Sequence, residues 1–506
     1  MTPHGYTVYD TLARNADHLG ARIGLVSEDG EPHSFRALRE RVDRLAGGLD
    51  GAGLGLGDRL VVLAQNSSAY FELYLAAARQ GVCLYPLNWR LSAEEIARSL
   101  ERADPRGIVV GAQYQAVLPA ALDPRMVRLQ FDGEPPSGWR RFSDLYAASP
   151  TPRPTVAAEA PFAIISTAAV DVIPRGAVLT HANLMWSNLQ TMVAMGLGPE
   201  DGNLLFLPLF HVAALTGALS VMHAGGKNVL MAGFDGAGAV RLIDEHGLTF
   251  IGDFPPILST ILDEAKAAGS ELASLKHVSG LDGPDTIARL HRETAADFWA
   301  GFGQTETSGF VTVQRARDKP GAAGKPGAVS AVALLDDYDQ PVPSGTAGEI
   351  VVRGPVVFQG YFAQPEVTEH TFRNGWHHTG DVGRFDEDGW LHYVRRKPEK
   401  ELIKPGGENV YPAEVETVIK ELPDVRAVCV FGVPDARWGE AVAAVVEAPV
   451  GRYTAEAISS HVGGRIARFK RPHHVGFAER LPRDDTGAVD REAVKAEWAE
   501  KVVGAK

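Results

Sequence analysis

One stretch of the chain has the setting of a phosphate-binding loop but not its usual residues. STAAVDVIPRGAVLTH, residues 166–181, follows a strand-like apolar run and precedes a helix-like one. Loops in such positions hold phosphate because glycines let several backbone N–H groups converge on the anion. Here no glycine occurs before Gly176, and Val170 and Val172 are β-branched residues that disfavour left-handed backbone. A phosphate held here would depend on side chains, and Arg175 is suited to grip two oxygen atoms at once.

A second stretch, GFGQTETSG at residues 301–309, combines an aromatic ring, hydroxyl groups and one carboxylate between glycines. Chemistry on a nucleoside triphosphate needs a divalent cation on the phosphates and an aromatic surface against the base. The stretch contains one side chain of each kind, Glu306 and Phe302. A polar turn between a strand and a helix would explain the same residues, so this stretch decides nothing alone.

Length and composition describe an ordinary folded protein with more than one core. The 506 residues are 45% hydrophobic and 22% charged, so we expect at least two domains. The net charge of -13 provides no basic field for a polyphosphate backbone, and no run of Lys and Arg is interleaved with aromatic residues. We therefore expect no nucleic-acid partner.

Neither a secretion signal nor a membrane span is expected. The first 20 residues lack a basic region followed by an apolar one. The most apolar window, residues 204–222, is interrupted by a proline and a histidine and is too short to cross a bilayer. Cys83 and Cys429 lie far apart in apolar surroundings, which favours two reduced core thiols in a cytoplasmic protein.

Strand-like runs alternate with amphipathic helices from about residue 23 onwards. Residues 35–49 place leucine and valine at spacings of three and four, which predicts a helix, and residues 58–65 predict a short buried strand. A helix over 68–81 and a strand over 82–87 follow. This βαβ rhythm predicts a parallel sheet covered by helices on both faces.

The pattern changes twice further along the chain. Residues 333–352 contain short strands broken by turns, which is typical of an antiparallel sheet or a small barrel. After Trp390, a short strand and a charged segment lead into a compact α+β pattern. We therefore predict an α/β fold with a large N-terminal domain, residues 1–394, made of doubly wound mixed sheets plus a small β-barrel-like subdomain. A small α+β C-terminal domain, residues 395–506, completes it.

Five segments occur in an order that is typical of one family. They are the stretch at 166–181, LPLFHVAAL at 207–215, GFGQTETSG at 301–309, WHHTGDVGRFDEDGW at 376–390 and RRKPEKELIKPGGENVYPAEVE at 395–416. Together they resemble the signature of the adenylate-forming (ANL) superfamily, which contains acyl-CoA synthetases, luciferases and peptide-synthetase adenylation domains. The resemblance covers nearly the whole chain. Each segment alone is weak, but the set is specific.

The resemblance implies roles for residues of the central segments. Glu306 matches the family's magnesium-binding glutamate, Thr305 its phosphate-binding threonine and Phe302 the ring that stacks on adenine. Asp381 matches the carboxylate that takes both ribose hydroxyls, whose two donors suit its two acceptor oxygens. Arg396 matches the arginine that reaches the same ribose, although a solvated basic turn would also explain it. The other nucleotide-binding positions that the resemblance implies are Thr167, Gly280, Leu281, Asp282, Gly303 and Gln304.

Further matches concern the acid and coenzyme A. His211 occupies the position of a gate beside the carboxylate pocket, with a buried core histidine as the alternative. Gly406 and Gly407 match the region that builds the pantetheine tunnel in thioester-forming relatives and so argue for coenzyme A, although a turn before a helix explains them too. Arg175 stands where lysine is usual. The catalytic residues that we expect are Thr305, Glu306, Arg175 and His211.

Two departures from the family fall in the same half-reaction. The Ser-Gly-Thr-Thr-Gly core of the phosphate loop is replaced by AAVDV, and Ala488 stands where the family carries the lysine that bridges substrate carboxylate and α-phosphate. A cation placed at developing charge contributes several kcal/mol, so its loss should slow adenylation by about two to four powers of ten. Lys495, Lys400 or Lys404 are the candidates to replace it.

The resemblance therefore implies an AMP-forming carboxylate-CoA ligase that uses ATP, Mg²⁺ and coenzyme A. The carboxylate attacks the α-phosphate and releases pyrophosphate, and the thiol then attacks the acyl-adenylate. The small domain is expected to be mobile and to turn about a hinge near Arg395 between the steps. We expect an aromatic or medium acyl carboxylic acid as substrate, a cytoplasmic location and no membrane partner. The sequence leaves a homodimer open.

Two rival functions draw on the same departures. An altered phosphate loop without the bridging lysine could suit an acid other than a fatty acid, such as nitrite in aryl diazotisation. A catalytically degenerate relative could retain only the binding of nucleotide or acyl-CoA. The presence of Thr305, Glu306, Asp381 and Arg396 argues against this second rival, because a binding relic has little need of the magnesium position.

Overall fold

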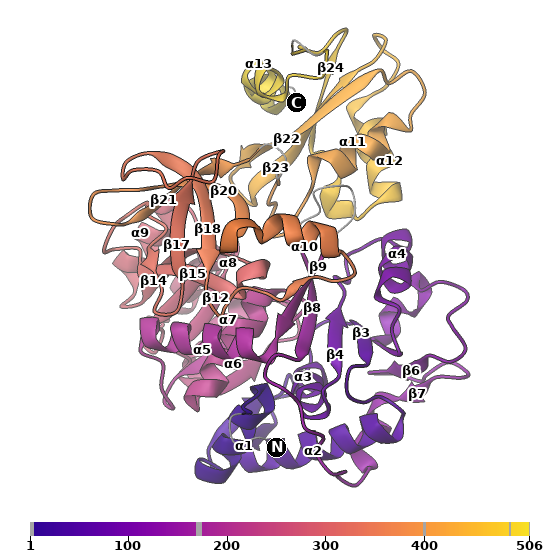
Figure 1. The fold of residues 1–506 in the computed structure, drawn as a ribbon, viewed down its shortest axis with the longest axis vertical. Coiled ribbons are helices and arrows are strands. Elements are labelled where there is room, and N and C mark those ends of the chain that lie inside the picture. Colours follow the sequence, from indigo (N-terminus) through magenta and orange to yellow (C-terminus); the bar gives the residue numbers. More distant parts are fainter. Residues whose placement is uncertain (1–4, 168–174, 398–400, 485–486, 505–506) are drawn as a thin grey trace.

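The chain folds into a large N-terminal part and a small C-terminal part, which lie at the bottom and the top of Figure 1. The computed structural model describes residues 5–167, 175–397, 401–484 and 487–504. In these residues the large part contains two extensive, mostly parallel sheets and one smaller antiparallel sheet, and the small part has a sheet of its own. The predicted α/β class with an α+β C-terminal domain is confirmed.

The first large sheet has the strand order β19-β9-β8-β4-β3-β5-β6-β7 in the described part of the chain. Its strands pair in parallel except at one edge, where β8, β9 and β19 are antiparallel. The strands are β3 (Arg59–Leu63), β4 (Cys83–Pro86), β5 (Gly107–Val110), β6 (Val127–Gln130), β7 (Arg140–Arg141), β8 (Pro161–Thr167), β9 (Arg175–Thr180) and β19 (Gly360–Tyr361).

The second large sheet has the order β16-β15-β14-β13-β12-β10-β11-β1-β2 among the described residues. It is parallel at its centre, and β2, β15 and β16 are antiparallel at its two edges. The strands are β1 (Ile23–Val26), β2 (Pro32–Ser34), β10 (Gly202–Leu205), β11 (Lys227–Leu230), β12 (Phe250–Asp253), β13 (His277–Gly280), β14 (Asp297–Gln304), β15 (Gly309–Arg315) and β16 (Lys325–Pro326).

Helices cover both faces of these sheets. Along β3, the buried Leu60 and Val62 pack in the main core cluster, whereas Val61 and Leu63 pack in a second cluster on the other face. This explains why a short strand is apolar throughout. The helices of the large part are α1 (Val8–His18), α2 (Phe35–Gly51), α3 (Ser68–Gln80), α4 (Ala93–Ala103), α5 (His181–Met195), α6 (Val212–Ala224), α7 (Gly236–His246), α8 (Ile257–Ala268), α9 (Pro284–Glu293) and α10 (Pro365–Thr371).

Local signals in the sequence set the ends of these helices. The side-chain oxygens of Ser34 and Ser67 accept the N–H groups of Ala37 and Tyr70, so each serine satisfies an otherwise unpaired donor in the first turn. Helix α3 ends at Gly81, which takes a left-handed conformation with φ of 73°. The helices predicted over 35–49 and 68–81 are thereby confirmed.

The antiparallel sheet predicted within residues 333–352 is present and larger than predicted. Strands β17 (Ala331–Leu335), β18 (Ala347–Arg353), β20 (His377–Phe385) and β21 (Leu391–Arg396) form it in that order. The last strand contains Arg395 and Arg396, which pair with Val382 and Asp381 of β20. The backbone at the predicted hinge is thus held in the large part's sheet in this orientation.

In the small part, three helices pack against a sheet and form two apolar clusters with it. Strands β22 (Ala427–Asp435) and β23 (Gly439–Glu447) are antiparallel, and β24 (His474–Ala478) runs parallel to β23. The helices are α11 (Pro412–Lys420), α12 (Ala455–Arg465) and α13 (Arg491–Gly504).

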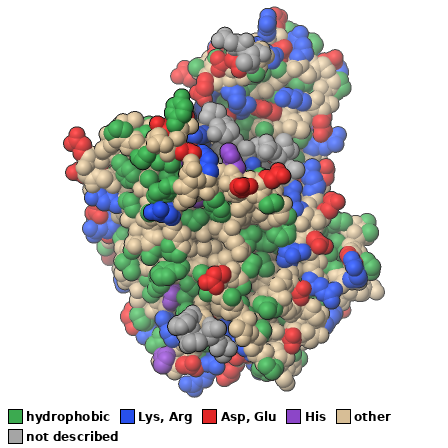
Figure 2. All heavy atoms as spheres, in the orientation of Figure 1, with side chains coloured by type: hydrophobic (Ala, Val, Ile, Leu, Met, Phe, Trp, Pro, Cys, Tyr) green, Lys and Arg blue, Asp and Glu red, His purple; other side chains and the backbone are tan. Residues whose placement is uncertain are grey.

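Surface and core agree with the bulk composition. Among the described residues, none of the helices combines the length and apolar character needed to cross a bilayer. Cys83 and Cys429 are both buried free thiols. On the face shown in Figure 2, basic and acidic side chains are interspersed, so the drawn side chains make no continuous basic field there.

A buried charge cluster joins the two parts. The Lys470 ammonium, on a side chain that is 4% exposed, lies 2.5 Å from Oε1 of Glu95 in α4 and 2.8 Å from both carboxylate oxygens of Glu414 in α11. Burial alone would raise the pKa of the Glu95 carboxyl, but Lys470 brings it below its ordinary value. One ammonium therefore holds carboxylates from both parts.

Removing that ammonium should destabilise the joined domains. We expect Lys470→Met to cost about 3–5 kcal/mol at neutral pH, because two carboxylates stay buried without their cation. The loss should shrink as the pH falls below about 5, where the carboxylates take up protons. Thermal unfolding against pH measures both effects. Lys501→Met, which breaks an exposed ion pair on α13, is the control and should change the melting temperature little; an equal drop in both variants would contradict this role.

Candidate active site

The β8–β9 hairpin carries the predicted phosphate loop at its tip. Its last described pair is Thr167 with Arg175. The altered AAVDV core lies outside the described residues. Thr167 is buried, and the Arg175 guanidinium lies over the ring of Tyr361, 5.3 Å from its centroid. The predicted catalytic arginine is therefore positioned by an aromatic ring of β19.

Glu306 sits in a short 3₁₀ helix, η3 (Thr305–Thr307), directly after β14. The residue is 8% exposed, and its Oε1 accepts a hydrogen bond of 2.9 Å from the Tyr361 hydroxyl. Burial and the Glu306 charge raise the pKa of Tyr361, so this hydroxyl stays a donor. Tyr361 thus connects the two residues expected at the phosphates, Arg175 and Glu306, and sequence reasoning missed it.

Asp381 is surrounded by donors from two other strands, β14 and β21. Asp381 is 1% exposed. Oδ2 accepts from Nε2 of Gln304 at 2.5 Å, and Oδ1 accepts from the Tyr393 hydroxyl at 3.2 Å. Nε of Arg396 lies 3.3 Å from Oδ1. The structure therefore brings together the two residues expected at the ribose, and the carboxylate retains lone pairs for further donors.

Other residues of the 301–309 segment pack close to Asp381. A Cβ on Gly303 would lie 2.2 Å from the carbonyl oxygen of Gly309, so no side chain fits there. Phe302 is buried in the apolar cluster of the antiparallel sheet. Gln304, expected to bind nucleotide, also donates to the carbonyl oxygen of Thr379 at 3.0 Å. Its amide fixes the orientation of Asp381, a role that its position in the motif does not reveal.

Two carboxyl groups lie at the ends of neighbouring parallel strands. Asp253 ends β12 and pairs with Gly280 of β13, and a Cβ on Gly280 would lie 1.8 Å from the Asp253 carbonyl oxygen. Burial and the nearby Asp282 charge raise the pKa of Asp253 well above its ordinary value, and burial raises that of Asp282. The Oδ2 atoms of both residues are buried without a hydrogen-bond partner. Leu281, which precedes Asp282, is 54% exposed.

The glycine pair of the small part reaches this same edge. Gly406 and Gly407 have φ of 57° and 83°, which favours glycine at both positions. A Cβ on Gly407 would lie 3.1 Å from the Phe254 ring, and one on Gly406 would lie 2.9 Å from the Trp438 ring. The two residues expected at coenzyme A therefore contact the loop that follows Asp253.

Glu408 ties the glycine pair to the large part. Its carboxylate accepts from Arg90 at 2.7 Å and from Asn88 at 2.8 Å, and His211 Nε2 lies 3.8 Å away. Burial would raise the pKa of Glu408, but these partners bring it below its ordinary value. The His211 side chain is 30% exposed, unlike a core histidine. Its role as a gate stays a prediction.

Of the three lysines that could replace the one missing at Ala488, the structure describes two, and they differ in exposure. Ala488 is exposed, and its N–H donates to the side chain of Asp484 within its own turn. Lys495 is exposed on α13, whereas Lys404 lies next to the glycine pair and is partly buried. Lys400 lies outside the described residues.

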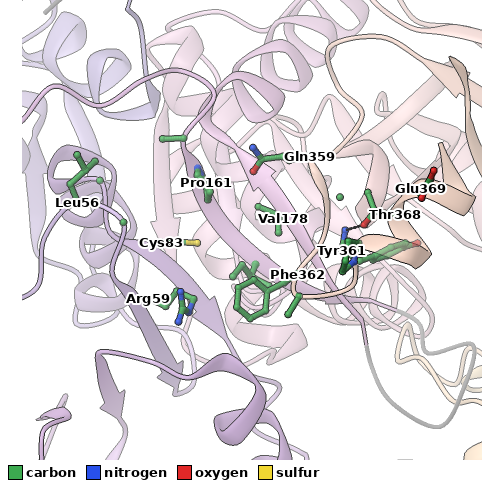
Figure 3. Close-up of a pocket in the computed structure, with 17 residues that line it drawn as sticks. Leu56, Arg59, Cys83, Pro161, Val178, Gln359, Tyr361, Phe362, Thr368 and Glu369 are labelled. Atoms are coloured by element: carbon green, nitrogen blue, oxygen red, sulfur yellow. Dashed lines mark hydrogen bonds between the residues drawn. The ribbon is translucent and has the colours of Figure 1, made fainter.

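A separate cavity of about 560 Å³ lies beside β8 and β9 (Figure 3). Leu56, Cys83, Val178 and Phe362 give it an apolar lining, and it shares Tyr361 with the Glu306 site. Arg59 and Glu369 also line it. Asp381, Glu306 and the glycine pair are not among the residues that line it.

The donor set fits a magnesium ion held mainly by its ligand. Among the described residues no three His, Cys, Asp or Glu side chains gather into a metal cage. Mg²⁺ needs only one or two protein carboxylates when phosphate oxygens and water supply the rest. Glu306 uses Oε1 for Tyr361 and keeps lone pairs on both oxygens, so it suits this arrangement.

Comparisons with known proteins show the family to which the chain belongs. A family model described as AMP-binding enzyme matches residues 12–362, and one described as AMP-binding enzyme C-terminal domain matches residues 414–488. A feruloyl-CoA synthase from an Amycolatopsis species is 33% identical over 485 residues, covering 94% of this chain and 95% of its own. An indoleacetate-CoA ligase from Aromatoleum aromaticum is 32% identical over 480 residues, covering 92% and 94%.

A solved structure extends the likeness to the fold. The o-succinylbenzoate CoA synthetase of Bacillus subtilis, bound to a product analogue, superimposes with a TM-score of 0.84 at 25% identity and covers 97% of this chain and 98% of its own. The chain therefore belongs to the AMP-binding enzyme family, within the adenylate-forming superfamily.

The Tyr361 hydroxyl offers a test of the Glu306 site. We expect Tyr361→Phe to weaken the enhancement of ATP binding by Mg²⁺ about tenfold, because a hydrogen bond to a charged group contributes about 1.5–3 kcal/mol. Calorimetric titration with ATP, with and without Mg²⁺, measures this difference without knowledge of the acid. Tyr338→Phe, at an exposed tyrosine, is the control. Equal Mg²⁺ enhancement in both variants would remove Tyr361 from the account.

Proposed function

We propose that the acid activated by this enzyme is an aromatic monocarboxylic acid carrying a hydrogen-bond donor. The protein is an AMP-forming carboxylate-CoA ligase that uses ATP, Mg²⁺ and coenzyme A. The observation that supports its mechanism is that Tyr411, which follows the hairpin with Gly406 and Gly407, has a buried hydroxyl on which the charges of Arg396, Glu306 and Arg175 act. Nucleotide, metal and thiol chemistry therefore share one space.

In the first step a carboxylate oxygen attacks the α-phosphorus of ATP. A new P–O bond forms as the bond to the β-phosphate breaks, and pyrophosphate leaves with the electron pair. We assign Asp381 and Arg396 to the ribose, and Arg175 with Thr305 to the phosphate oxygens. Glu306 would hold Mg²⁺, which when bound supplies positive charge on those oxygens. The Tyr361 hydroxyl keeps Glu306 in place.

In the second step the thiol sulfur of coenzyme A attacks the carbonyl carbon of the acyl-adenylate. AMP leaves with the oxygen that came from the acid. We place the pantetheine arm along Gly406 and Gly407, since a Cβ on Gly407 would lie 3.1 Å from the Phe254 ring and would narrow that passage. Rotation of the small domain, residues 395–506, about Arg395 stays part of the proposal for the full cycle.

The choice of acid rests on the pair Asp253 and Asp282. Each has a raised pKa and an orphaned buried oxygen beside the loop that contacts Gly407. Such oxygens accept a hydrogen bond from a phenol or an indole N–H, and they disfavour a second carboxylate on the substrate. The names of two relatives, a feruloyl-CoA synthase and an indoleacetate-CoA ligase, point to the same class. A medium-chain acyl group is the second choice.

A substrate panel tests the proposal. AMP release with coenzyme A would be measured for ferulate, indoleacetate, octanoate and 2-succinylbenzoate. We expect kcat/KM for at least one of the two aromatic monocarboxylates to exceed that for octanoate by about tenfold or more, equivalent to about 1.4 kcal/mol of transition-state binding. The dicarboxylate should be the poorest. Preference for octanoate or the dicarboxylate would overturn the proposed acid class.

A second arm separates the rival functions. Nitrite with an aminophenol replaces the acid and coenzyme A, and the product mass is determined. A diazo product there, with no acyl-CoA from the panel, would favour the nitrite-activating reading. Calorimetry that finds no binding of ATP and Mg²⁺ would favour a catalytically degenerate relative.

The cellular setting is a further part of the proposal. Two buried free thiols suit a reducing compartment, so we place the enzyme in the cytoplasm. A homodimer is compatible with this assignment, and light scattering at assay concentration decides between monomer and dimer.

A further inference from the structure

The adenylation step lacks the cation that the family places at residue 488. Ala488 is exposed and its backbone is bonded within its own turn. Arg175 and Arg396 remain, but Arg175 packs on Tyr361 and Arg396 lies against Asp381. A cation placed between the substrate carboxylate and the α-phosphate must come from elsewhere, and the small domain's hairpin at residues 403–410 provides one.

The geometry of this hairpin directs two side chains away from the small domain's core. Ile403 and Val410 exchange two backbone hydrogen bonds of 2.9 Å, and both side chains are buried in the small domain's apolar cluster. Side chains alternate along extended backbone, so those of Lys404 and Tyr411, next to the paired residues, leave on the opposite side.

That opposite side faces the large domain. Gly407 at the hairpin tip contacts Phe254, and Glu408 is bonded to Arg90 and Asn88. The hairpin is thus pressed against the edge of the cleft that holds the acid and nucleotide positions.

Tyr411, directly after the hairpin, has a side chain that comes near the residues assigned to the nucleotide. The residue is 7% exposed, and its hydroxyl has no hydrogen-bond partner. The charges of Arg396, Glu306 and Arg175 all act on this hydroxyl. A buried hydroxyl without a partner is costly, and the surrounding residues are those assigned to ribose, metal and phosphate. A phosphate oxygen of the nucleotide would be the missing partner.

Lys404 carries a positive charge, which is opposite to that of the phosphate. Its residue is partly buried, and this burial together with Arg396 lowers the pKa of Lys404 to about 8, opposed by Asp381 and Glu440. Its backbone N–H, not its ammonium, bonds to Glu440. Among the residues that the structure describes, no carboxylate forms an ion pair with this ammonium. A cation beside the ribose carboxylate, held without a counter-ion of its own, is poised for an anionic ligand.

We propose that Lys404 is the catalytic cation of adenylation, bridging the substrate carboxylate and the α-phosphate in place of residue 488, with the Tyr411 hydroxyl donating to the same phosphate. The inference rests on the proposed function. The ammonium stays protonated while the P–O bond to the acid forms and the bond to pyrophosphate breaks, so no proton needs to move. Lys404 and the Gly406–Gly407 pair share one hairpin.

Separate assays of the two half-reactions test this. ATP-pyrophosphate exchange without coenzyme A reports adenylation, with ferulate and with indoleacetate as the acids. Thioester formation from synthetic feruloyl-adenylate and coenzyme A reports the second step. We expect Lys404→Met to lower exchange by about 10²–10³-fold and the second step by less than tenfold. Tyr411→Phe, which removes one oxygen atom, should lower exchange about tenfold.

Two lysine variants serve as comparisons. Lys420→Met, at an exposed residue of α11, should leave exchange within twofold of the parent enzyme. Lys495→Met tests the rival lysine and should do the same. Exchange by Lys404→Met within threefold of the parent, or a loss of exchange in Lys495→Met alone, would overturn the proposal. A parent enzyme that exchanges with neither acid would instead count against the proposed function.

The pH profile separates a catalytic charge from a structural role. The protonated ammonium is the active form, so kcat/KM for ATP in exchange should fall as the pH rises through about 8. Arg396, Asp381 and Glu440 are the other charged groups that act on Lys404, and although burial lowers the pKa of Arg396, Asp381 raises it above its ordinary value, so this guanidinium keeps its charge. Lys404→Arg keeps its charge and should show no such fall. The same fall in Lys404→Arg would contradict the assignment.

Discussion

The arrangement of the active site depends on a buried carboxylate that neither domain can stabilise alone. Glu408 belongs to the small domain, and its donors Arg90 and Asn88 belong to the large one. A carboxylate removed from water costs several kcal/mol unless charges and hydrogen bonds compensate it. Lys470 is a second charge that is paired across the interface, because this buried ammonium of the small domain contacts Glu95 of the large domain. The observed orientation is therefore the one in which these charges are paired.

In that orientation a hairpin of the small domain covers the loop that follows β12 of the large domain. The interface charges hold the hairpin at residues 403–410 against the loop after β12, so Gly407 lies beside Phe254. The large domain meanwhile fixes Asp381, the carboxylate proposed to bind the ribose, through Gln304 and Arg396. Cations and carboxylates from both domains then surround one space in which a triphosphate would supply the missing negative charge. The site is assembled by the interface and is not carried by either domain alone.

Much of this could be predicted from the sequence, because local periodicity and short motifs encode it. The helix at 35–49 follows from its apolar spacing, and the residues at Asp381 and Glu306 follow from the motif that contains each. Contacts between distant segments could not be predicted. Tyr361 donates to Glu306 across 55 positions, and Asn88 donates to Glu408 across 320. No local pattern reports such pairs, since they exist only once the sheets and domains have packed.

The role of a residue within a motif also could not be predicted fully without knowing its neighbours in space. Gln304 reads as a nucleotide-binding position, and its amide instead holds the carboxylate that is expected to bind the ribose. Lys404 had no special status among the candidate lysines until its hairpin was placed against the cleft. The altered phosphate loop, by contrast, lies outside the described residues, so its contribution remains the prediction made from AAVDV. Side chains at the loop's stem and in the small domain carry the phosphate chemistry in this account.

The central claim is that a carboxylic acid is activated as its adenylate and then passed to coenzyme A. An acid labelled with ¹⁸O in its carboxylate tests this directly, with ATP, Mg²⁺ and coenzyme A present and mass spectrometry of both products. The account predicts one ¹⁸O atom in the phosphate of each AMP, formed in equal amount with the acyl-CoA. Acyl-CoA formed with ADP, or with AMP that carries no label, would contradict it.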